Sequence, residues 1–159
     1  MILTDLFAMI LRLAELAFAA IVAGINGEYL HAVRNTDSWD QGRFIYTEVV
    51  AGVAIFLSLI WLFPFSGSFV HWPVDILISI CWFAAFGLLV NALDGGCGYV
   101  FDWGNVSFRR DDQCGKWKAV IAFAFLSAIC WLVSAVIGLI WVRDHERRTY
   151  RRRWYRSSV

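Results

Sequence analysis

Long apolar runs separated by short polar stretches form the main pattern of this chain. Three runs contain no Asp, Glu, Lys or Arg, and they cover residues 49–70, 76–93 and 119–142. A further run near the N-terminus is interrupted by Arg12 and Glu15. About 20 apolar residues suffice for a helix to cross the hydrocarbon core of a bilayer. The pattern therefore predicts transmembrane helices at residues 6–30, 46–66, 74–94 and 117–142.

Short connectors between these runs place consecutive helices side by side and antiparallel. Pro64 is expected to end the second helix, while Pro73 and Asp75 suit the first turn of the third. Glu48 is likewise expected in the first turn of the second helix. The predicted fold is all-α, an integral membrane up-down four-helix bundle over residues 1–142. A basic tail follows it at residues 143–159.

Composition supports a membrane protein. Of the 159 residues, 60% are hydrophobic and 17% are charged, which leaves too little polar surface for a soluble domain of this size. Trp61, Trp117 and Trp141 lie near the predicted span ends, as in an interfacial aromatic belt. Trp82 and Trp131 fall in mid-span, where we favour the bundle core over the acyl chains.

Arg12 and Glu15 are the charges inside a span that need an explanation. Their spacing of three residues puts them on one helix face, where they can pair. The long stem of Arg12 would also let its charge reach the nearby membrane surface. We favour a structural ion pair over an ion or proton site. The same two charges, with no basic residues before them, argue against a cleaved signal peptide.

Small residues recur at a spacing of four, the pattern that lets helix backbones approach closely in lipid. Examples are Ala20 with Gly24 and Ala124 with Ala128. For these we favour contact inside the bundle over an interface between two copies.

The stretch "CGYVFDWGNVSFRRDDQC", residues 97–114, is the most polar connector. Cys97 and Cys114 bracket it, and Asn105 begins an N-glycosylation pattern. Disulfides persist in oxidising compartments and N-glycans are added on the lumenal side. We therefore expect a Cys97–Cys114 disulfide and a candidate glycan at Asn105, on the lumenal or extracellular side. Cys81 and Cys130 lie inside spans and are interpreted as small apolar side chains.

The C-terminal segment is rich in arginine and aromatic residues. Arginines next to a span attract anionic lipid on the cytoplasmic leaflet. The positive-inside rule favours a cytoplasmic tail only slightly, because six basic residues lie on the opposite side, but the cysteine-bracketed loop agrees with it. Four spans then put both termini in the cytoplasm. Seven arginines are expected to contact anionic headgroups: Arg143, Arg147, Arg148, Arg151, Arg152, Arg153 and Arg156.

Motifs for catalysis are missing from the sequence. It contains no zinc-ligand spacing, phosphate-binding glycine loop or nucleophile elbow. We expect no enzyme, catalytic residue, metal or cofactor, and no nucleic-acid partner. Membrane lipids are the expected partners, with a homo-oligomer or a larger membrane complex left open.

Two stretches resemble the MARVEL domain in its fungal form. "CGKWKAVIAFAFLSAICWLVSAVIG", residues 114–138, is similar to the fourth span of that family, and "GRFIYTEVVAGVAIF", residues 42–56, to the entry of its second span. The resemblance implies membrane organisation, such as lipid sorting or vesicle trafficking, at the plasma membrane or in the secretory pathway. An accessory subunit packed against a larger membrane enzyme or transporter is the alternative.

Overall fold

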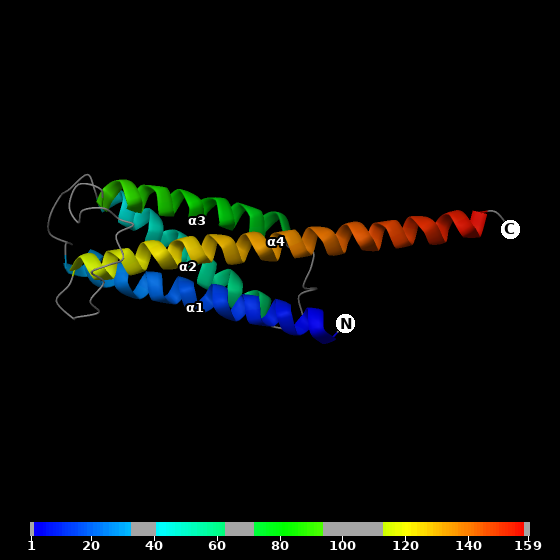
Figure 1. The fold of residues 1–159 in the computed structure, drawn as a ribbon, viewed down its shortest axis with the longest axis horizontal. Coiled ribbons are helices and arrows are strands. Elements are labelled where there is room, and N and C mark those ends of the chain that lie inside the picture. Colours follow the sequence, from blue (N-terminus) through cyan, green and yellow to red (C-terminus); the bar gives the residue numbers. More distant parts are fainter. Residues whose placement is uncertain (1, 33–40, 63–71, 94–112, 158–159) are drawn as a thin grey trace.

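The computed structural model of the chain is an α-helical bundle (Figure 1). It describes residues 2–32, 41–62, 72–93 and 113–157, with side chains described within 6–32, 41–62, 72–93 and 114–145 and at 147. The helices are α1 (Ile2–Ala32), α2 (Gln41–Leu62), α3 (Trp72–Leu93) and α4 (Gln113–Ser157). All four are long and apolar enough to span a membrane. The predicted all-α four-helix membrane bundle is confirmed.

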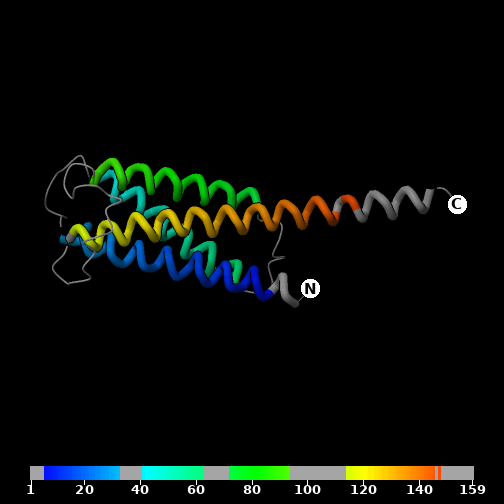
Figure 2. The backbone as a smooth tube through the Cα atoms, viewed as in Figure 1, coloured from blue at the N-terminus to red at the C-terminus, as the bar shows by residue number. Residues whose placement is uncertain are grey.

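Consecutive helices run in opposite directions and pack in a ring. α1 packs against α2 and α4, and α3 packs against the same two helices. α1 and α3 therefore lie on one diagonal of the bundle, with α2 and α4 on the other. Figure 1 shows the start of α1 and the end of α4 at the same end of the bundle, and Figure 2 shows α4 continuing past the other helices.

Many small side chains lie in the interior, and many large apolar ones cover the outside. Ala19, Ala51, Ala85 and Ala124 are fully buried, which lets the helix backbones approach closely. Large apolar residues are exposed on every helix, among them Ile10, Phe56, Ile80 and Ile140. Such a surface is unfavourable in water and suits acyl chains. The chain is therefore an integral, multi-pass membrane protein.

Helix boundaries differ from the predicted spans mainly in α2 and α4. α2 begins at Gln41, so Glu48 lies two turns inside the helix and the expectation of a first-turn position is wrong. α2 ends at Leu62, in line with the nearby Pro64. α4 continues without a break to Ser157, because the residues after Val142 include no glycine or proline to stop it.

Two packing expectations need correction. Trp117 is 7% exposed and belongs to the bundle core instead of an interfacial belt, whereas Trp141 is exposed. Ala20 and Gly24 face outward, so their small-residue pattern makes no contact inside the bundle.

The other packing expectations hold. Ala124 and Ala128 are buried between helices. Trp82 and Trp131 are fully buried, as favoured from the sequence.

Candidate functional site: a charged layer across the bundle

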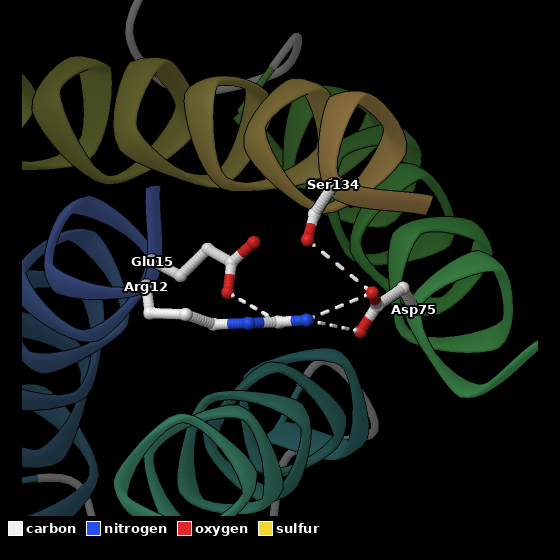
Figure 3. Close-up of polar contacts among 4 residues, drawn as sticks. All are labelled: Arg12, Glu15, Asp75 and Ser134. Atoms are coloured by element: carbon white, nitrogen blue, oxygen red, sulfur yellow. Dashed lines mark hydrogen bonds and ion pairs between the residues drawn. The ribbon is translucent and has the colours of Figure 1, made fainter. Parts of the chain in front are cut away.

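An ion pair crosses the bundle along the diagonal between α1 and α3. Arg12 on α1 donates from Nη2 to both carboxylate oxygens of Asp75 on α3, at 2.8 and 3.1 Å. Figure 3 shows the guanidinium extended from one helix to the other. Arg12 is 8% exposed and Asp75 is 2% exposed. One guanidinium nitrogen is thus shared by both oxygens of a carboxylate on another helix, and this charge-assisted contact constrains the distance and the register of the two helices.

Glu15 and Ser134 complete the polar part of this site. Arg12 Nη1 donates to Glu15 Oε2 at 2.8 Å, and Ser134 Oγ on α4 donates to Asp75 Oδ2 at 3.3 Å. Glu15 is fully buried. One guanidinium is thus shared by two carboxylates, and hydrogen bonds link α1, α3 and α4.

Two tryptophans enclose the guanidinium along the other diagonal. The Arg12 Cζ atom lies 4.6 Å from the ring centroid of Trp61 on α2 and 5.2 Å from that of Trp131 on α4. The two rings meet edge to face, with centroids 5.8 Å apart. Cations are attracted to the faces of such rings, more strongly where water is excluded. We call these six residues the charged layer: Arg12, Glu15, Asp75, Ser134, Trp61 and Trp131.

The antiparallel order of the helices explains how these residues meet. Trp61 lies in the last turn of α2 and Asp75 in the first turn of α3, so both sit at the end of the bundle that carries the two chain termini. Arg12 and Ser134 reach the same level from α1 and α4. An antiparallel bundle brings the early part of α1 beside the late part of α4.

The side chain of Arg12 does not extend to the membrane surface, although the sequence allowed this. The structure turns it inward instead, because Asp75 and Glu15 supply hydrogen-bond acceptors there. A buried guanidinium that is paired and hydrogen-bonded avoids most of the penalty of an isolated charge. The expected contact between Arg12 and Glu15 is present. The ion pair between Arg12 and Asp75 was not predicted, because the position of Asp75 in the first turn of a helix was a sufficient reason for its charge.

Some polar atoms near this layer are buried without a hydrogen-bond partner among the described residues. They include Glu15 Oε1, Trp131 Nε1 and Ser127 Oγ. Buried polar groups are normally hydrogen-bonded, so each exception needs a physical reason. No group of three or more His, Cys, Asp or Glu in the described part of the chain is placed to hold a metal ion.

A second contact region lies near the opposite end of the bundle. Tyr29 on α1 packs edge to face on Trp117 of α4 and also touches Phe44 of α2, with ring centroids 4.7 and 4.9 Å apart. Phe44 and Trp117 meet across the diagonal at 4.8 Å. We call these three residues the aromatic layer. Beside it, Asn26 Nδ2 donates to the Phe44 carbonyl at 2.8 Å and to Glu48 at 2.9 Å.

Comparison with models of known protein families shows to which family the chain belongs. The family model of the membrane-associating domain called MARVEL matches residues 5–137. The chain belongs to the MARVEL family. No curated protein matches the sequence. Every residue of the charged layer and the aromatic layer lies inside the MARVEL match, and the arginine-rich end of α4 lies beyond it.

The remaining predicted site residues are described in part. Cys97 and Asn105 of this MARVEL protein lie outside the described residues, so the disulfide to Cys114 and the glycan stay predictions. Cys81 and Cys130 are free thiols. Of the seven arginines, Arg143 and Arg147 have described side chains, and both are exposed.

Proposed function

We propose that this MARVEL protein organises lipid at the membrane and catalyses no reaction. The observation that supports this most is the continuity of α4, which runs from the span Cys114–His145 into the arginine-rich segment up to Ser157. The first arginine of this segment, Arg143, still belongs to that span, and on this proposal the arginines that follow it along the helix lie near the lipid headgroups. Anionic headgroups there are attracted by about 1 kcal/mol per basic residue.

The outer surface of the bundle supports the same role. Large apolar residues cover all four helices, while Arg12, Glu15 and Asp75 are buried in the charged layer. The bundle thus offers acyl chains an apolar wall and keeps these three charges away from them. The resemblance of residues 114–138 to the fungal form of the family supports a role in lipid domains or trafficking, in the plasma membrane or the secretory pathway. On this proposal both termini face the cytoplasm.

Lipid enrichment around the reconstituted full chain tests the proposal. The protein, labelled with a donor dye, is placed in vesicles that mix neutral lipid with acceptor-labelled anionic lipid, and energy transfer reports enrichment. We expect enrichment that falls as salt is added, because surface charges are screened over about 8 Å at physiological ionic strength.

Two variants separate charge from helix structure. Replacing the seven arginines by glutamine should abolish the enrichment, since glutamine keeps a similar helix propensity without charge. Replacing them by lysine keeps the charge and should preserve it. Equal enrichment in all three proteins, independent of salt, would show that the arginines serve topology alone.

A second candidate is the role of accessory subunit in a larger membrane complex. The outward-facing Ala20 and Gly24 favour it, because small residues on the lipid side leave room for a partner helix. Mass measurement of the protein extracted gently from its native membrane separates the two candidates. One chain with lipid supports the lipid-organising role, and a defined assembly with a larger protein supports the subunit role.

A further inference from the structure

The two carboxylates of the charged layer are held very differently by Arg12. Asp75 receives two hydrogen bonds from the guanidinium and one from Ser134. Glu15 receives one, at Oε2, although it is fully buried. Its Oε1 atom is buried with no hydrogen-bond partner among the described residues. In Figure 3 one carboxylate oxygen of Glu15 is turned away from the guanidinium.

We propose that Glu15 is a proton-binding site, and that the folded bundle holds Glu15 as the neutral acid at neutral pH. A carboxylate oxygen that is buried without a donor keeps its charge at a high cost, because nothing replaces the water it has lost. A proton taken up at Oε1 removes that charge. It also leaves Oε2 free to accept the hydrogen bond from Arg12, so the observed contact is retained.

The groups that face Glu15 from the packed helices favour the same state. Arg12 is the cation beside it, but its guanidinium also holds Asp75 on α3. Asp75 lies close enough for its charge to repel an anionic Glu15. From α4 the free thiol of Cys130 and the hydroxyl of Ser134 face this layer, and neither is a cation. From α2 the contact is Trp61, which has no titratable group.

Proton binding at Glu15 would link the packing of the bundle to pH. In the unfolded chain a glutamate releases its proton near pH ~4.3. The folded chain would therefore carry a proton that the unfolded chain lacks at neutral pH. The free energy of unfolding then falls as the pH rises above the pKa of glutamate in the unfolded chain, because the folded chain binds more protons than the unfolded chain. The charged layer lies at the end of the bundle with the chain termini, so the compartment on that side would supply the proton.

Infrared spectroscopy of the full chain in detergent or lipid nanodiscs tests the proposal directly. A protonated carboxyl group has a C=O stretch that is resolved from the bands of ionised carboxylates. At neutral pH we expect this band in the wild type and its loss in Glu15→Gln. The matched control is Glu28→Gln, on the same helix but exposed beside Lys116, which should leave the band unchanged. A spectrum without the band, or a band that Asp75→Asn removes and Glu15→Gln keeps, would overturn the assignment.

Thermal unfolding provides a second readout. Glutamine has nearly the shape of a protonated glutamate, so Glu15→Gln should fold. It should melt at or above the wild-type temperature at neutral pH, because it has no proton to release on unfolding. Its melting temperature should fall less steeply than that of the wild type as the pH is raised. A Glu15→Gln variant that fails to fold, or that melts well below the wild type at neutral pH, would show that the charge of Glu15 is required and would contradict the proposal.

Discussion

The charged layer and the aromatic layer both join helices across the bundle, but by opposite means. In the charged layer, Arg12 holds Asp75 across one diagonal and is enclosed by two tryptophan rings along the other. In the aromatic layer, Phe44 and Trp117 meet across a diagonal by ring contact. A missing ring leaves a void, whereas a missing ion leaves a buried charge. The charged layer should therefore be the less tolerant of the two.

The largest effect is expected when Asp75 is replaced by alanine. This change leaves the buried Arg12 with Glu15 as its acceptor, and breaking a buried ion pair costs about 3–5 kcal/mol. Unfolding by denaturing detergent, followed by circular dichroism, measures the loss. Glu28→Ala is the control, because its ion pair with Lys116 is exposed and should contribute less than about 1 kcal/mol. Equal losses in the two variants would remove the distinction between buried and exposed pairs.

A somewhat smaller effect is expected in the aromatic layer. Trp117→Ala removes a buried ring that touches Tyr29 and Phe44, and the cavity should cost about 3 kcal/mol. Trp117→Phe keeps most of the ring contact and should lose about half as much. The same unfolding measurement compares them. If phenylalanine is no better than alanine, ring packing does not hold this end of the bundle.

Asn26 should contribute less to the free energy of unfolding than Asp75 or Trp117. One of its hydrogen bonds goes to a neutral carbonyl, and the other is only partly buried. Asn26→Ala removes its bonds to the Phe44 carbonyl and to Glu48, and such bonds within membranes average about 0.6 kcal/mol. Ser127→Ala is a matched control, because the buried Ser127 hydroxyl has no partner among the described residues. It should be neutral or slightly stabilising. A larger loss from Ser127→Ala than from Asn26→Ala would contradict the hydrogen-bond assignment.

The smallest change in the free energy of unfolding is expected at the exposed ion pair of Lys116 and Glu28, in which Nζ lies 3.3 Å from Oε1. Lys116→Gln should change the free energy of unfolding by less than about 1 kcal/mol. Any difference from the wild type should vanish in high salt, because exposed charges are screened. A loss that persists in high salt would place this pair among the buried contacts.

Much of the fold could be predicted from the pattern of apolar runs. Helices that cross a bilayer must be long and apolar, so their number and approximate positions follow from the sequence. Their order around the bundle follows from short connectors. Helix ends were less predictable: the second helix, expected from residue 46, begins at Gln41, because apolar length marks the membrane-crossing part of a helix and not the polar turn before it.

The candidate site was only partly predictable. Arg12 and Glu15 stand out because charges within a span are rare and need partners. Asp75 was explained too easily by its place in the first helical turn, so its pairing with Arg12 was missed. A signal was available: antiparallel order brings the early part of α1 and the start of α3 to the same end of the bundle. The roles of Trp61 and Ser134 depend on helix rotation, which the sequence pattern does not define.

A double-mutant cycle on Arg12 and Asp75 tests the central claim most directly, namely that their pair locks α1 to α3 across the bundle. Arg12→Met and Asp75→Leu are made singly and together in the full chain, and the free energy of unfolding is measured for each. Each single variant leaves a buried charge, whereas the double variant replaces the pair by apolar side chains, which is often tolerated. We predict that the double variant is more stable than either single one, with a coupling of about 2–3 kcal/mol. If the losses of unfolding free energy in the two single variants simply add in the double variant, Arg12 and Asp75 do not hold α1 and α3 together.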